Sequence, residues 1–457
     1  MAEINKESGN DLLKSKLIFI VLGSYSILAV FLSLFWSGSL FSLFLLLASV
    51  AIFLLALFYP IFGFFALLTF RTAFDYAGSE IALFSIFSIP VSFTFLMGVI
   101  LIALAAIQLI KRKFNFFKEK TFWPWLLFLF ITAVLSIFSF DKSSSLVNFF
   151  RLLSFFSAFI FGFLIFDNAK KITNLARVII FSAIIPAAAA WVQLINRGGF
   201  YDGERWRLVG TFTHPNMLAI YLVLIICLTI FVALNLRKKA IEKIPYLFLA
   251  IFFIIPLLFT YTRIAWLSLA FILFFVGVYR FRKLLLISVL AFFLLYFFAP
   301  FFQDRISTLV GIAASDSSSW RINLWKDIIS YIKDSPWFGY GPGTASVFLK
   351  KNVPRLLVET EPHNDYLKIW LESGIFALLS YLWIFIDYLK RMYQGFKTEK
   401  RPRLKILYFF LILFTLSMGG ASLTDNVLKD AVMQWEFWVL SGGLLAIIKL
   451  GNKKELS

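Results

Sequence analysis

Apolar residues run along this chain in long blocks, separated by short polar turns. About 20 apolar residues in a row can cross the roughly 30 Å hydrocarbon core of a bilayer as an α-helix, which satisfies its own backbone hydrogen bonds. We predict fourteen spans, of which the third is short and is either a span or a re-entrant segment. They lie at 17–36, 39–57, 60–75, 89–110, 121–139, 146–166, 174–196, 217–235, 244–260, 264–279, 284–300, 374–390, 405–422 and 433–449. The expected fold class is an all-α polytopic integral membrane protein with about 12–14 transmembrane helices, a single transmembrane domain over 1–457.

One long hydrophilic stretch, 301–373, interrupts this pattern and is predicted to be a large loop. Within it, apolar residues recur at three- and four-residue steps from Trp320 to Ile332, with charged residues between them, which predicts an amphipathic helix. Two interpretations stay open: the helix lies on the membrane surface, or it packs on the rest of the loop.

Composition supports a membrane protein, because 61% of the residues are hydrophobic and only 15% are charged. The net charge of +19 at first suggests a nucleic-acid partner. If the N-terminus is cytoplasmic, however, the predicted cytoplasmic segments hold most of the Lys and Arg residues, as the positive-inside rule requires, so no nucleic-acid partner is expected. This orientation places both termini in the cytoplasm and the 301–373 loop outside. The single cysteine, Cys227, excludes a disulfide framework.

Two motifs that suggest ligand binding are better explained as local structure. Gly339, Gly341 and Gly343 follow no predicted strand, so neither a Rossmann nor a P-loop interpretation holds, and loop geometry is expected. Asp202 and Glu204 form a short acidic pair, but no histidine lies at ligand spacing, and the neighbouring Arg205 and Arg207 are ready salt-bridge partners. No metal site and no cofactor are therefore expected.

Arginines on the predicted outer face are informative because the positive-inside rule does not explain them. Arg205 and Arg207 lie in the outer loop before residue 217, and Arg263 lies in a tight turn between two spans. The planar guanidinium binds phosphate oxygens in a bidentate manner, so these residues suit a diphosphate at the membrane surface. For Arg151 and Arg197, reaching out to lipid headgroups is the simpler interpretation.

Both histidines of the chain are predicted on the outer face, each next to a proline and an asparagine. His363 precedes the helix that leads from the large loop into the membrane, with Asn364, Asp365 and Glu372 nearby. Histidine accepts a proton near neutral pH, so His363 is the candidate general base. His214 begins a span, where we expect it mainly to cap the helix, and Asp365, Glu361 and Glu372 are the next candidates for a base.

Three stretches of the chain resemble the O-antigen ligase and O-antigen polymerase-like family of bacterial membrane glycosyltransferases. They are the run from Arg207 through His214 to Ala219, the turn Tyr261–Leu267, and the loop from Arg321 through Gly339–Gly343 and His363 to Gly374. The resemblance covers about 200–390. One departure is Thr262 before Arg263, where the family often has serine.

The resemblance implies a GT-C-like, inverting and metal-independent enzyme of the bacterial cytoplasmic membrane, with its active site on the outer face. Such an enzyme moves a glycan from an undecaprenyl-diphosphate carrier to an acceptor hydroxyl. On this chain the resemblance implies His363 as the catalytic residue and Arg207, Arg263 and Arg321 as diphosphate-binding residues. O-antigen ligase, repeat-unit polymerase and O-oligosaccharyltransferase stay open, as do the sugar, the glycan, lipid or protein acceptor, and the oligomeric state. The alternative from another class is a transporter or flippase of lipid-linked glycans, which predicts basic residues at the bilayer midplane between repeated halves.

Overall fold

The computed structural model describes residues 38–86, 89–235, 240–304, 316–353 and 361–455. Within these residues nine helices are long and apolar enough to cross a membrane, and three shorter apolar helices accompany them. Only two short antiparallel hairpins of β-strand occur in the described part of the chain. The predicted all-α polytopic membrane fold is confirmed, and the first predicted span, 17–36, lies outside the described residues.

The first half of the described chain runs from α2 to the second hairpin. Its elements are α2 (Gly38–Phe58), α3 (Pro60–Ala73), α4 (Asp75–Glu80), β1 (Ala82–Ile86), β2 (Ile89–Ser92), α5 (Phe93–Lys111), η1 (Phe116–Lys118), η2 (Lys120–Phe122), α6 (Trp123–Phe138), α7 (Lys142–Ile165), α8 (Ala169–Ser182), α9 (Ile184–Asn196), β3 (Phe200–Tyr201) and β4 (Trp206–Arg207).

Among its described residues, the second half contains helices and connecting turns but no strand. It comprises α10 (Pro215–Asn235), η3 (Ala240–Lys243), α11 (Ile244–Phe259), α12 (Arg263–Tyr279), α13 (Arg282–Phe298), α15 (Asp316–Asp334), α16 (Ala345–Asn352), α17 (Asp365–Thr398), α18 (Pro402–Ala421), η4 (Val427–Lys429) and α19 (Ala431–Glu455).

Several predicted spans have different ends or an internal break. The predicted span 89–110 begins as strand β2, which pairs with β1, and the helix starts only at Phe93. The predicted span 174–196 is divided into α8 and α9 just before Pro186, which has no backbone N–H to continue the helical hydrogen bonds. The span predicted at 374–390 begins earlier, at Asp365, and is broken at Gly374.

Two central helices, α7 and α19, cross at very short distance. A Cβ atom added at Gly162 would lie 2.1 Å from the carbonyl oxygen of Val439, and one added at Gly442 would lie 2.1 Å from that of Phe159. Glycine is therefore required at both positions, as at other close helix crossings in membranes. This crossing forms the centre of the core, on which α5, α6 and α17 pack.

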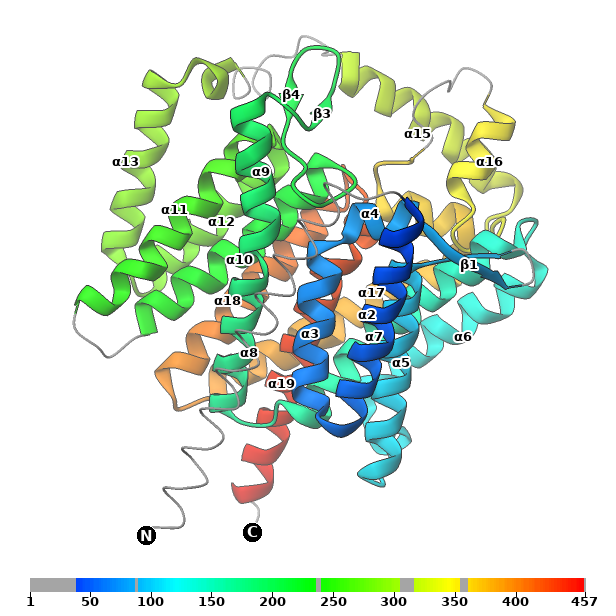
Figure 1. The fold of residues 1–457 in the computed structure, drawn as a ribbon, viewed down its shortest axis with the longest axis horizontal. Coiled ribbons are helices and arrows are strands. Elements are labelled where there is room, and N and C mark those ends of the chain that lie inside the picture. Colours follow the sequence, from blue (N-terminus) through cyan, green and yellow to red (C-terminus); the bar gives the residue numbers. More distant parts are fainter. Residues whose placement is uncertain (1–37, 87–88, 236–239, 305–315, 354–360, 456–457) are drawn as a thin grey trace.

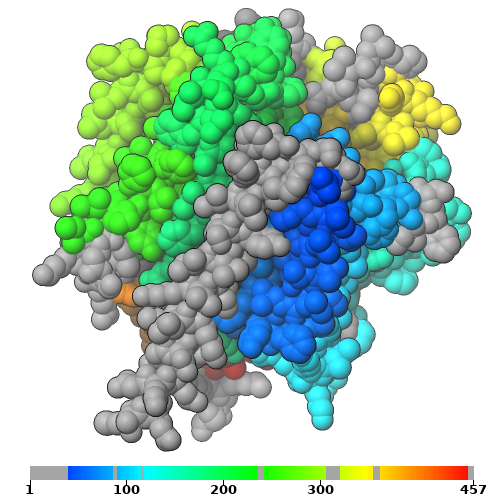
Figure 2. All heavy atoms as spheres, viewed as in Figure 1, coloured from blue at the N-terminus to red at the C-terminus, as the bar shows by residue number. Residues whose placement is uncertain are grey.

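The helices are arranged so that the loops discussed below gather at one end of the molecule. Hairpin β3–β4, α15 and α16 lie at the upper end in Figure 1, opposite the C-terminal end of α19. Helix α13 stands at the edge beside α12, and none of its side chains is buried, as expected for a helix in lipid. Figure 2 shows α2 and α3 on the near surface, between the green to yellow-green α9, α11 and α13 on one side and cyan α5–α6 with yellow α16 on the other.

The predicted amphipathic helix in the large loop is present as α15. Its apolar residues Leu324, Ile328 and Ile332 are buried in a second, small core together with residues of α16 and with Leu371 of α17. The helix therefore packs on the rest of the loop, which decides between the two interpretations of its apolar side.

Candidate functional site

His363 lies immediately before α17, in a backbone conformation that residues with a side chain rarely adopt. Its φ is 49°, in the left-handed region, which costs a residue with a side chain of the order of 1–3 kcal/mol. Two contacts fix the segment: the indole N–H of Trp325 donates to the Pro362 carbonyl (2.8 Å), and the Asn364 side chain accepts the Leu367 N–H as the helix cap (3.0 Å). These hydrogen bonds of Pro362 and Asn364, the two neighbours of His363, stabilise its strained backbone conformation.

The imidazole of His363 is buried and faces a carboxylate. Its Nδ1 lies 3.5 Å from Oδ1 of Asp425, and the two side chains are 7% and 9% exposed. The Trp320 ring meets the imidazole edge-on, with centroids 6.0 Å apart. Burial alone would raise the pKa of Asp425, but His363, with a smaller contribution from His214, outweighs burial and lowers that pKa below its usual range. Asp425 is therefore an anion at neutral pH, placed to orient the imidazole and to stabilise its protonated form.

Both histidines line one cavity, which has an empty volume of about 590 Å³ when its open mouth is included. Its polar walls come from the segments before α10 and α17 and from the α18–α19 connection: His214, Asn216, Glu361, His363, Asp425 and Lys429. His214 also accepts the Asn216 N–H at Nδ1 (3.2 Å), the helix-start cap predicted for it.

Arg207 joins the loop before α10 to the turn between α11 and α12. Its Nε donates to the Thr260 carbonyl (2.8 Å), and its Nη2 donates to the Asn216 side chain (2.8 Å) and to the Thr262 hydroxyl (3.2 Å). Asn216 is itself a wall residue of the histidine-lined cavity. Arg207 therefore braces the turn that carries Arg263, the first residue of α12, at the edge of this cavity.

The other two arginines predicted at the site are Arg205, in the loop after β3, and Arg321, on α15. Arg205 pairs with Glu204 (2.7 Å). Its guanidinium lies over the ring of Tyr261 (5.2 Å), in the turn between α11 and α12. The acidic pair of this loop thus does have arginine partners, since Asp202 also lies 4.0 Å from Nε of Arg207. Arg321 is on α15, next to the Trp320 that contacts His363.

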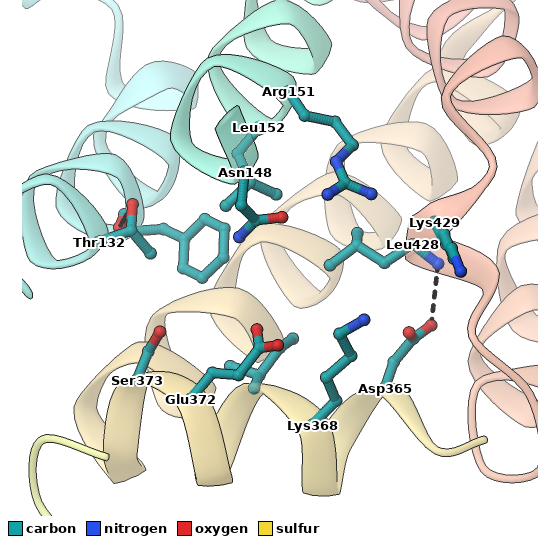
Figure 3. A pocket seen from close by; sticks show the side chains of 12 residues that line it. Thr132, Asn148, Arg151, Leu152, Asp365, Lys368, Glu372, Ser373, Leu428 and Lys429 are labelled. Atoms are coloured by element: carbon teal, nitrogen blue, oxygen red, sulfur yellow. Dashed lines mark hydrogen bonds between the residues drawn. The ribbon is translucent and has the colours of Figure 1, made fainter. Parts of the chain in front are cut away.

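A second cavity lies beside the first, between α6, α7 and α17, and shares Lys429 with it. Figure 3 shows Arg151, Lys368 and Glu372 around this space, with Asp365 at its edge. Arg151 thus faces an interior cavity (Figure 3), and the interpretation that it reaches out to lipid headgroups is wrong.

Glu361 connects the two cavities through its ion pairs. Its carboxylate accepts from the ammonium groups of Lys368 (3.0 Å) and Lys429 (3.1 Å) and from the hydroxyl of Ser346 (2.7 Å). Burial favours the neutral acid, but these partners outweigh burial and hold the pKa of Glu361 well below its usual range. Glu361 is thus a fixed anion that neutralises two lysines, which does not suit a general base.

The remaining predicted residues hold the loop in place. Asp365 accepts from the Ser422 hydroxyl (2.9 Å) and the Leu428 N–H (3.0 Å), which fixes the start of α17 to the α18–α19 connection. Glu372 accepts the Ala345 N–H at the start of α16 (3.0 Å).

The glycine turn packs against the break in α17. Gly339 has a φ of 64° and Gly374 a φ of 72°, and a Cβ atom on Gly374 would lie 1.9 Å from the Trp337 carbonyl oxygen. These glycines therefore serve the loop geometry, as expected, because they allow a positive φ and a close approach of backbone segments.

Sequence reasoning missed Asp425, Lys429 and Lys368. Asp425 and Lys429 occupy the short polar connection between the last two predicted spans, 423–432, and this concentration of charges in an outer loop was the available signal. Lys368 lies one turn after Asn364, the cap of α17. Its contact with Glu361 depends on the folded loop and has no signal in the local sequence.

Comparison with known proteins bears on the site. Residues 247–382, which include α12, α15, α16 and His363, match the family described as O-Antigen ligase. The chain is 26% identical over 188 residues to a protein of Rickettsia felis named "Putative polysaccharide ligase", covering 38% of this chain and 43% of that protein. It is 26% identical over 143 residues to the teichuronic acid biosynthesis protein TuaE of Bacillus subtilis, covering 30% of this chain and 27% of the relative. These matches thus span less than half of each relative. The predicted resemblance to the O-antigen ligase family is confirmed, on a match that covers residues 247–382.

Proposed function

We propose that this protein is a membrane glycosyltransferase that moves a glycan from an undecaprenyl-diphosphate carrier to an acceptor hydroxyl, on the outer face of the bacterial cytoplasmic membrane. The observation that carries the proposal is the buried His363–Asp425 pair on a cavity whose rim includes the Arg207 network. The match to the O-antigen ligase family and the polysaccharide-related names of the relatives agree with it.

The proposed reaction is a single in-line displacement. The acceptor oxygen attacks the anomeric carbon, the bond from that carbon to the diphosphate oxygen breaks, and the lipid diphosphate leaves with the electron pair. His363 accepts the proton of the acceptor hydroxyl, and the anionic Asp425 stabilises the imidazolium that forms. The proton then passes from His363 to water.

Negative charge grows on the diphosphate as this bond breaks, and fixed cations stabilise it best. Arg263 is assigned to bind the leaving diphosphate. Arg207 keeps the turn of Arg263 in place through Thr260 and Thr262 and adds its own charge beside the cavity. Arg321 is assigned a supporting role from α15. Because arginines provide the charge, transfer is expected to persist in EDTA.

Purified protein in bilayer nanodiscs, supplied with an undecaprenyl-diphosphate-linked glycan and an acceptor, tests the proposal. We expect free undecaprenyl diphosphate and glycosylated acceptor to form in equal amounts, with inversion at the anomeric carbon. A protein that moves the intact donor lipid across vesicles without cleaving it would contradict the proposal and support a flippase. The chain length of the product distinguishes a ligase from a repeat-unit polymerase.

A further inference from the structure

The cavity between α6, α7 and α17 has no part in the reaction described above, although it adjoins the histidine-lined cavity. Its empty volume is about 430 Å³, counting space open to solvent, and charged residues form much of its wall. Such groups are costly to bury and usually mark a ligand or a paired charge. The question is which of these charges lacks a partner.

The carboxylates of this cavity have donors close by. Asp365 accepts from Ser422 and from Leu428, Glu372 accepts the Ala345 N–H, and the nearby Glu361 pairs with both lysines. Lys368 and Lys429 thus both pair with one shared anion.

Arg151 is the exception. Among the residues that the structure describes, its guanidinium makes neither a side-chain hydrogen bond nor an ion pair, while its backbone carbonyl accepts from the Ser154 hydroxyl (2.6 Å). Figure 3 shows this guanidinium extending into the cavity, on the same side as Leu428 and Lys429. A guanidinium presents a planar set of donors that fits a carboxylate or phosphate in a bidentate manner.

We propose that this cavity binds an oxyanion carried by the acceptor glycan, with Arg151 as its main ligand; the assignment to the acceptor rests on the proposed function. The positions of the charged residues favour the acceptor over the donor as the molecule that carries this oxyanion. Arg207 contacts Asn216 on the wall of the histidine-lined cavity, whereas Arg151 lines the other cavity, and Lys429 lines both. A donor diphosphate near Arg207 and an acceptor anion at Arg151 place the acceptor hydroxyl between them, at His363.

The cavity accepts a group and not a whole sugar chain, because its empty volume is only about 430 Å³ even when open solvent is counted. The chemical class is therefore an acidic saccharide, in which a carboxylate or a phosphate substituent enters the cavity. Arg151 acts as a specificity residue for this substituent.

The test compares two acceptors: an oligosaccharide ending in a uronic acid and the same oligosaccharide after reduction of its carboxyl group. In wild type we expect a KM at least about tenfold lower for the acidic acceptor, as for a charge-assisted bidentate contact. Arg151→Gln should remove this preference and leave the KM for the donor unchanged, and Arg151→Lys should restore part of it. Arg197→Gln, an exposed arginine at the end of α9, is the matched control and should behave like wild type.

An equal KM of wild type for both acceptors would overturn the proposal. An equal rise in KM for both acceptors in Arg151→Gln would overturn it as well. A raised KM for the donor in Arg151→Gln would assign the cavity to the donor diphosphate instead. Equilibrium binding of the two oligosaccharides to His363→Ala separates this inference from the proposed reaction. Preferential binding of the acidic form there, dependent on Arg151, supports the cavity assignment even if no transfer occurs, and its absence contradicts it.

Discussion

Asp425→Asn is a close test of His363 as the general base. Asparagine has nearly the same shape, and its side-chain oxygen can still accept the Asn426 N–H that Asp425 accepts in the structure (2.8 Å). What is lost is the negative charge 3.5 Å from Nδ1 of His363. Because both side chains are buried, this charge is poorly screened by water.

A contact of this kind with a charged partner contributes about 1.5–3 kcal/mol, and about 1.4 kcal/mol corresponds to a tenfold change in rate. We therefore expect Asp425→Asn to lower kcat about 10–100-fold, because the imidazolium formed during proton transfer loses its counter-charge. The loss should be no larger than that for His363→Ala, about 10²–10⁴-fold for a positioned general base.

The assay is steady-state transfer from a defined undecaprenyl-diphosphate donor by purified variants in nanodiscs. The matched control is Asp387→Asn, which removes an ion pair with Arg391 (2.6 Å) further along α17 and should leave kcat unchanged. Equal rates for Asp425→Asn and wild type, with both proteins monodisperse, would refute the role of the pair. A raised KM for the donor at unchanged kcat would instead assign Asp425 to substrate binding.

Three further predictions follow from the site and the topology. Arg263→Lys keeps the charge but loses the planar fork, so we expect a large loss of transfer in Arg263→Lys and in Arg263→Ala, and wild-type rates in both would leave no role for this residue in the reaction. Cysteine at Lys350 should react with a membrane-impermeant reagent in spheroplasts and cysteine at Lys397 should not; the reverse result would overturn the orientation. Glu361→Gln should lower the melting temperature at neutral pH, because the folded state holds the pKa of this carboxyl below its usual 4.5. That difference should shrink as the pH falls below about 4.5, because the carboxyl of the unfolded chain takes up a proton there before that of the folded protein does. A difference that does not change with pH would contradict the ion-pair explanation.

The sequence predicted much of the fold because the length and hydrophobicity of each span are local properties. The helix start at Pro215 is marked by its proline and the amphipathic α15 by its helical period, whereas α17 begins at Asp365, before the predicted span 374–390. Breaks inside spans were harder to predict. The division at Ala183 depends on where Pro186 falls within an apolar run, and the non-helical Gly374 depends on packing against the turn of Trp337.

The site was predicted only in part, because it is assembled from segments far apart in the chain. His363 and His214 were identified from their residue type and position, and the structure places both on one cavity. Nothing local to His363 indicates Asp425, which is 62 residues further along and reaches it through the α18–α19 connection. The role of Arg151 was hidden for the same reason, since an arginine near a helix end has the same local pattern whether it faces headgroups or a cavity.

The most direct test of the proposed function is the release of undecaprenyl diphosphate by His363→Ala and His214→Ala, measured side by side with saturating donor and acceptor. The two variants remove the same group from the same cavity, but Nδ1 of His363 lies 3.5 Å from Asp425, whereas His214 caps α10. We predict that His363→Ala loses release by about 10²–10⁴-fold while donor binding persists, and that His214→Ala loses much less. Abolished release in His214→Ala with normal release in His363→Ala would contradict the assignment of the base.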